Sequence, residues 1–136
     1  MIRTYLDAGV LIAAARGNAA IALRALEVLD DPNREFASSI FLKLEVLPKA
    51  TYHRNVAEAE FYQAFFDTVV YWADALDSVT AEAFKEACGL GLAALDALHV
   101  AAAVSVGAAE LVTTEKPENP FTAPARFRLF PFGMKV

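Results

Sequence analysis

Residues 92–112, LAALDALHVAAAVSVGAAELV, form the most apolar run of the chain, and this run carries Asp96 and His99 near its start. Its small apolar residues predict a helix over about residues 93–106, and Gly107 is a typical residue to end it. The next segment, ELVTT at 110–114, is typical of a β-strand. A buried helix that leads into a strand favours an α/β domain in which the helix packs tightly on a sheet.

The rest of the chain alternates strand and helix patterns in the same way. Pro48 is expected to kink or end the helix that contains it. The alternation predicts one domain over residues 1–136, with three α/β/α layers and a central, mostly parallel sheet of four to five strands. The further strands are expected at residues 3–6, 35–39, 69–73 and 126–132, and the further helices at 9–17, 18–30, 40–53, 55–68 and 80–88.

The composition narrows the possible partners. The 136 residues are 57% hydrophobic with a mean hydropathy of +0.36, which favours apolar contact with a partner or a second copy, so a homodimer is expected. The net charge of −5 argues against binding nucleic acid through a broad basic surface. Phosphate chemistry on such a chain would need help from metal ions.

Cysteine content and hydropathy favour a cytoplasmic protein without a membrane segment. Cys88 is the single cysteine, cannot form an internal disulfide and is expected to be a small buried hydrophobe. The apolar run at 92–112 is about long enough to cross a bilayer, but it contains Asp96, His99 and Glu110.

Four carboxylates are expected to meet at one edge of the sheet. In an open parallel sheet the ligand crevice lies outside the carboxyl ends of the strands. Asp7 and Glu115 directly follow two predicted strands, Glu45 lies two turns into the helix after another, and Asp96 lies in the first turn of its helix. Such a cluster is costly unless a cation sits within it, and oxygen ligands suit Mg²⁺ or Mn²⁺. This arrangement favours metal-assisted hydrolysis of a phosphodiester.

Each acid also has an ordinary structural interpretation. Asp96 can be an N-cap or a first-turn acid, and Asp7 can be a turn residue. Glu45 can be a solvated helix acid, and Glu115 can belong to a charged loop. His99 is expected to be a hydrogen-bonded histidine at the edge of the core, because hydrolysis by metal-activated water needs no imidazole.

The sequence resembles the PIN domain, a family of metal-dependent ribonucleases that includes the VapC-type toxins of toxin-antitoxin pairs. The resemblance rests on TYLDAGVLIAA at 4–14, SSIFLKLEV at 38–46, LDALHVAAA at 95–103 and ELVTTEKP at 110–117, in this order. It implies a PIN-like three-layer fold, an RNA substrate and a cognate antitoxin protein. It further implies that one or two Mg²⁺ or Mn²⁺ ions are held by Asp7, Glu45, Asp96 and Glu115, with hydroxyl assistance from Thr113 or Thr114.

Two departures from the family pattern leave other functions open. Glu115 stands where the family usually has Asp, and KPEN follows it instead of a second acid and an aromatic residue. A PIN-like binding module with weak or no nuclease activity is therefore the alternative. A phosphoacceptor domain using Asp74 or Asp77 with Lys116 is a further one, although no second acid adjoins Asp7 as that class requires. Candidate RNA contacts are Arg3, Arg16, Lys43, Lys49 and Lys116.

Overall fold

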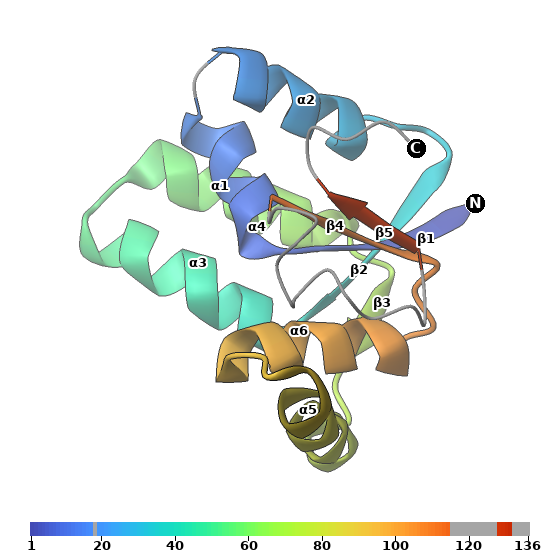
Figure 1. Ribbon diagram of the computed structural model, residues 1–136. Helices are drawn as coiled ribbons and strands as arrows, with labels where there is room; N and C mark the ends of the chain where they lie inside the picture. Colours follow the sequence, from blue (N-terminus) through green and yellow to red (C-terminus); the bar gives the residue numbers. More distant parts are fainter. Residues whose placement is uncertain (18, 115–127, 132–136) are drawn as a thin grey trace.

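The computed structural model describes residues 1–17, 19–114 and 128–131, and a five-stranded sheet forms its centre (Figure 1). Every adjacent pair of strands is parallel, and the strand order is β3-β2-β1-β4-β5. The prediction of a three-layer α/β/α domain with a mostly parallel sheet of four to five strands is confirmed. The strands are β1 (Ile2–Leu6), β2 (Arg34–Ser39), β3 (Tyr71–Ala73), β4 (Glu110–Thr113) and β5 (Arg128–Pro131).

The helices of the described residues occupy the segments between these strands, in the expected order. They are α1 (Ala8–Arg16), α2 (Ala19–Leu29), α3 (Ile40–Tyr52), α4 (Val56–Thr68), α5 (Leu76–Leu90) and α6 (Ala94–Ser105).

Helix α3 includes Pro48, as expected for the helix over residues 40–53, whereas the start of α5 differs from the expectation. Pro48 lies inside α3 without ending it, because Pro48 and Leu44 are both exposed and water can reach the carbonyl that loses its donor. Helix α5 begins at Leu76 and not at Thr80. The Thr80 hydroxyl does not cap a helix start but donates 2.8 Å back to the Leu76 carbonyl inside the helix.

Side chains of successive strand residues point to opposite faces of the sheet, so both faces are apolar and both are covered. Leu6, Phe36 and Val112 pack against α1, α2, α3 and α4, whereas Tyr5 and Leu111 pack on the other face against α5 and α6. Figure 1 shows α5 and α6 on one side of the sheet, with α1, α2 and α4 on the other. Because helices pack on both faces of the sheet, the carboxyl ends of the strands, where the candidate site lies, are held in fixed positions.

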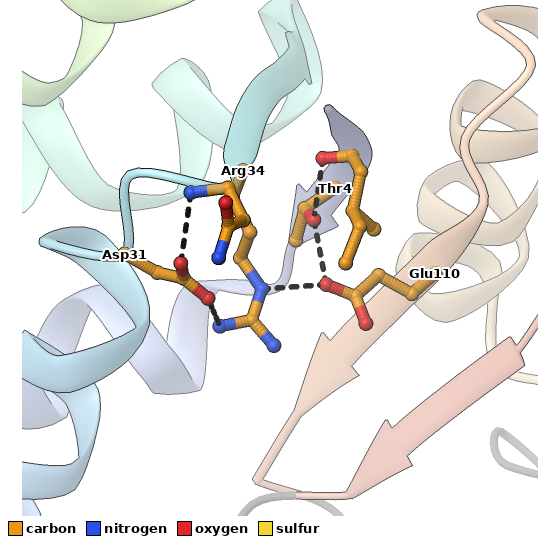
Figure 2. A network of polar contacts seen from close by, with 6 residues as sticks. Thr4, Asp31, Arg34 and Glu110 are labelled. Atoms are coloured by element: carbon orange, nitrogen blue, oxygen red, sulfur yellow. Dashed lines mark hydrogen bonds and ion pairs between the residues drawn. The ribbon is translucent and has the colours of Figure 1, made fainter.

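A buried ion-pair network joins three strands at the amino ends of the sheet (Figure 2). Arg34 Nε lies 2.6 Å from Glu110 Oε1, and the same oxygen accepts from the Thr4 hydroxyl at 2.6 Å. Arg34 also contacts Asp31 at 2.8 Å. The Glu110 side chain is only 1% exposed, so this contact ties β1, β2 and β4 together through a desolvated charge.

Cys88 is exposed on α5, so the prediction that it is buried is wrong; the buried positions near that end of the helix are taken by Ala83 and Glu86.

Among the described residues, no single helix is long and apolar enough to cross a membrane. Helices α1 and α2 reach that length only when counted together, with a bend of 120° between them.

Candidate functional site

Asp7 lies at the carboxyl end of β1 and begins α1. Its backbone N–H donates 3.1 Å to the Val112 carbonyl, which fixes the residue against β4. Its Oδ1 accepts the Val10 backbone N–H at 3.1 Å, so Asp7 is the N-cap of α1. Its Oδ2 accepts a short hydrogen bond from the Thr113 hydroxyl. Asp7 is only 7% exposed, and a carboxylate with this burial is uncommon for a helix cap alone.

The end of β4 packs closely on the start of α1. A Cβ on Gly9 would lie 2.0 Å from Thr114 Oγ1, so only glycine allows the Thr114 side chain to take this position. Thr113 is buried and holds Asp7, whereas Thr114 is exposed beside it. Of the two predicted hydroxyls, Thr113 is therefore the one whose side chain contacts a predicted acid.

Glu45 reaches the same end of the sheet from α3 and is held by His99. Glu45 Oε1 lies 2.8 Å from His99 Nε2, and the other ring nitrogen, Nδ1, lies 2.7 Å from the Tyr5 hydroxyl. The Tyr5 hydroxyl in turn lies 2.7 Å from Ser39 Oγ, the N-cap of α3. His99 is 2% exposed, so the prediction of a hydrogen-bonded histidine at the core edge is confirmed.

Asp96 lies in the first turn of α6 and is half-buried. The N-cap of α6 is Ala93, which makes no side-chain capping bond, so the N-cap interpretation of Asp96 is wrong and its interpretation as a first-turn acid is confirmed. One turn separates Asp96 from His99, and this places both on the part of α6 that meets the end of the sheet.

The carboxylates interact electrostatically around the His99 ring. Burial raises the pKa of Asp7 from 3.8 to about 6, although hydrogen bonds from Thr113 and Val10 and the nearby His99 oppose this rise. Burial also raises the pKa of Asp96, with the charge of Glu45 adding to the rise and His99 opposing it. Asp7 and Asp96 are thus both acids whose negative charge the protein compensates incompletely.

The structure brings three of the four predicted acids to one end of the sheet: Asp7, Glu45 and Asp96. Glu115, Lys116, Glu118 and Asn119 lie outside the described residues. Within the described part of the chain, no three His, Cys, Asp or Glu side chains stand close enough together to hold a metal ion as they are. The oxygen donors suit Mg²⁺, which commonly binds one or two carboxylates and completes its shell with water and phosphate oxygens.

A pocket of about 260 Å³ opens beside Glu45, between α1, α3 and α4. Its lining includes Arg16, Lys49 and His53, so two of the candidate RNA contacts lie next to a predicted site acid. Arg16 pairs only loosely with Glu58, at 3.7 Å, and its side chain is 62% exposed.

Two other basic candidates are engaged elsewhere. The Arg3 guanidinium carbon lies 3.6 Å from the centre of the Tyr71 ring, and its Nη1 donates to the Val106 carbonyl at 2.8 Å. Lys43 lies over the Phe66 and Trp72 rings and points away from Glu45. Arg3 and Lys43 therefore face other parts of the molecule than the candidate site.

Sequence reasoning missed Tyr5 and Ser39 as parts of the site. Both belong to segments that the resemblance singled out, but their hydroxyls carried no signal in isolation. The available signal was position: Tyr5 is two residues before Asp7 on β1, and Ser39 ends β2. Both face α6 at the carboxyl end of the sheet, where His99 lies.

The parallel sheet with helices on both faces defines a three-layer α/β/α domain with the PIN-like fold that the sequence predicts. Comparison with solved structures gives a chain in the crystal structure of VapBC2 from Rickettsia felis bound to a DNA fragment from their promoter. The match has a TM-score of 0.69 and 14% sequence identity, and it covers 96% of this chain and 98% of that one. Comparisons with protein-family profiles and with curated protein sequences give no match. The structural likeness therefore supports the fold, with nearly complete coverage of both chains.

Proposed function

We propose that the protein is a metal-dependent ribonuclease and the toxin of a toxin-antitoxin pair. The observation that carries this proposal is the meeting of Asp7, Glu45 and Asp96, from three different elements, around one buried histidine at the carboxyl end of a PIN-like sheet. That end is where parallel α/β sheets bind ligands. The structural likeness to a chain of a VapBC2 complex supports the same conclusion.

Asp7, Asp96 and Glu45 would hold Mg²⁺ or Mn²⁺, with Glu115 as a fourth candidate. Such an ion supplies a water activated for in-line attack and neutralises charge on the phosphate and the leaving oxygen. Thr113 keeps Asp7 aimed at the site by donating to one of its oxygens. His99 keeps one oxygen of Glu45 engaged. No side chain is required to act as the nucleophile.

The RNA strand would enter along the pocket beside Glu45. Lys49 and Arg16 lie on its lining, and they can contact phosphates on either side of the scissile bond although the chain as a whole is acidic. Because both side chains are long and exposed, they can reach a phosphate without rearrangement of the backbone.

The site is tested by cleavage of single-stranded RNA with Mg²⁺ or Mn²⁺. Asp96→Asn should slow cleavage by about a hundredfold or more, because it removes one of the carboxylates that would hold the ion that neutralises charge on the phosphate. Asp67→Asn, at an exposed acid near the end of α4, is the matched control and should cleave normally. Wild-type cleavage in excess chelator, or full activity of Asp96→Asn, would contradict the proposal.

A PIN-like binding module is the second candidate, because the described carboxylates do not form a complete ion site. The two functions differ in metal binding. A ribonuclease should gain thermal stability in millimolar Mn²⁺, since an ion that binds only the folded state raises Tm. An unchanged Tm together with intact RNA would favour the binding module.

The antitoxin would use an apolar pocket between α2 and α4. This pocket has a volume of about 210 Å³ and is lined mainly by Leu26, Leu29, Phe61 and Phe65. It suits the apolar residues of a helix or an extended segment. Ala64 lies exposed at its edge, so Ala64→Glu should abolish complex formation with the protein encoded beside this one while Tm changes little. Coexpression followed by size-exclusion chromatography measures this, and an intact complex would place the antitoxin elsewhere.

The homodimer predicted from composition stays a proposal. Large apolar side chains are exposed on α3 and α5, where Leu44 is 69% and Phe84 is 73% exposed. Contact through such residues would bury apolar surface that is otherwise costly to leave in water.

A further inference from the structure

His99 is a buried residue that the hydrolysis described above does not use as an acid or a base. Its ring is 2% exposed and contacts polar groups through both nitrogens. A buried histidine of this kind could simply stabilise the fold. What distinguishes this one is its partner, because Nε2 faces Glu45, a residue that reaches the candidate site from another helix.

The direction of the contact between His99 and Glu45 follows from the chemistry of the two groups. An ionised carboxylate can only accept a hydrogen bond, so Nε2 carries the proton and donates to Glu45 Oε1 whatever the state of the other nitrogen. In the neutral ring, Nδ1 then accepts from the Tyr5 hydroxyl, and Tyr5 accepts from Ser39. Among the described residues no hydrogen bond engages Glu45 Oε2, so this oxygen remains available to a ligand.

The hydrogen bonds from Ser39 through Tyr5 and His99 hold the Glu45 side chain in place. Ser39 is the N-cap of α3, the helix that carries Glu45, and it accepts the Leu42 backbone N–H at 3.4 Å. Tyr5 is 0% exposed and lies on the central strand β1. The ring of His99 is thus held between the sheet and the start of α3, and a side chain with several free torsions is restricted to one orientation. Glu45 is 31% exposed, so without this contact it could turn to solvent.

We propose that His99 is a positioning residue that holds one oxygen of Glu45 so that the other faces the metal, with Tyr5 and Ser39 fixing the ring. The expected effect on metal binding rests on the proposed function, whereas the contact between His99 and Glu45 rests on the hydrogen-bond geometry alone. Partners that orient metal-binding side chains commonly change metal affinity by about tenfold to a hundredfold when they are removed.

The first test compares two substitutions of His99 that differ in which ring nitrogen they imitate. Glutamine places its amide nitrogen near Nε2 and can still donate to Glu45, whereas asparagine reaches only the position of Nδ1. His99→Asn should weaken Mn²⁺ binding, measured by calorimetry, by about tenfold or more. His99→Gln should stay within about threefold of wild type. Tyr5→Phe removes the hydroxyl that fixes the ring and leaves the contact of Nε2 with Glu45 in place. It should still weaken Mn²⁺ binding relative to wild type, so it tests the inference where His99→Asn does not fold.

The second test needs neither metal nor activity. The chain has two histidines, His53 and His99, and His53 is exposed. In histidine-labelled protein, NMR should show one slowly exchanging Nε2 proton from His99, and Glu45→Gln should shift it. An absent proton, or equal Mn²⁺ affinity in His99→Asn and wild type, would overturn the inference. Wild type that binds no Mn²⁺ and cleaves no RNA would instead refute the proposed function, while the NMR signal would still decide the contact.

Discussion

An Asp7→Asn variant should be inactive and yet more stable than wild-type protein in metal-free buffer at pH 7.5. Asp7 is 7% exposed, and burial raises its pKa from 3.8 to about 6, so ionising it in the folded state costs free energy. This elevation corresponds to about 3 kcal/mol of lost stability at neutral pH. Asparagine has the same shape and no charge to bury. Allowing for weaker hydrogen bonding to Thr113, we expect a gain of about 2 kcal/mol, or about 6 °C in Tm.

The pH dependence of this gain has a definite sign. Because the folded pKa of Asp7 lies above the unfolded value, folded wild-type protein binds the extra proton between about pH 4 and pH 6. The contribution of Asp7 to stability therefore falls as pH rises through this window and is constant above it. Asp7→Asn has no carboxyl to ionise and does not lose stability in this window. The unfolding free energies of Asp7→Asn and wild-type protein should therefore differ little at pH 4 and most above pH 6. Urea unfolding at several pH values measures it.

Two further measurements, with Mn²⁺ and with a control variant, distinguish the cost of the buried Asp7 charge from a general change in stability. Saturating Mn²⁺ should stabilise wild-type protein more than Asp7→Asn and so narrow the gap at pH 7.5. Asp30→Asn, at an exposed acid after α2, should change neither activity nor the pH profile. Wild-type cleavage by Asp7→Asn would remove Asp7 from the site. An unchanged stability difference between pH 4 and pH 7.5 would show that its charge is well solvated. A residue that lowers stability while it serves activity is typical of functional sites.

The fold could be predicted because its signals are local. The apolar run at 92–112 and the alternation of strand and helix patterns require only periodicity and turn residues. Predictions from local sequence rules were wrong where the position of a residue in the folded structure decided the outcome. Helix α5 was expected to begin at Thr80, but it begins at Leu76, and the Thr80 hydroxyl bonds to the Leu76 carbonyl inside the helix. Cys88 was expected to be buried from its residue type, whereas the face of α5 on which it lies is exposed.

The candidate site could be predicted only in part, because the hydrogen bonds that hold its side chains join residues far apart in the sequence. The rule that parallel strands end at one edge was enough to place Asp7 and Glu45 together. It did not predict how they are held, since the contacts of Tyr5 with His99 and Ser39 join residues far apart in the chain. Nor did it predict the pairing of Arg34 with Glu110, because each of these charges alone is typical of an ordinary strand end. Hydrogen-bond partners of buried polar groups follow from packing, which sequence periodicity does not encode.

The Arg34–Glu110 network should have the largest effect on stability of any ion pair in the described residues (Figure 2). Glu110→Ala leaves the Arg34 guanidinium, 10% exposed, without its carboxylate on β4 and should cost about 3 kcal/mol. Glu110→Gln keeps an oxygen for Thr4 and Arg34 and should cost about 1 kcal/mol. Lys85→Ala, which breaks an exposed pair with Glu82 at 3.7 Å, is the control and should cost less than about 0.5 kcal/mol.

A double-mutant cycle decides whether this network stabilises the fold through the pairing itself. If the pairing itself stabilises the fold, then Arg34→Met combined with Glu110→Leu should lose much less stability than the sum of the losses in Arg34→Met and Glu110→Leu alone. Additive losses would mean that each side chain acts through separate contacts. The network lies at the amino ends of the strands, opposite Asp7, so RNA cleavage per folded molecule should stay at the wild-type rate in Glu110→Gln. A reduced rate in fully folded Glu110→Gln would mean that strand register at the amino ends controls the position of the acids at the other end.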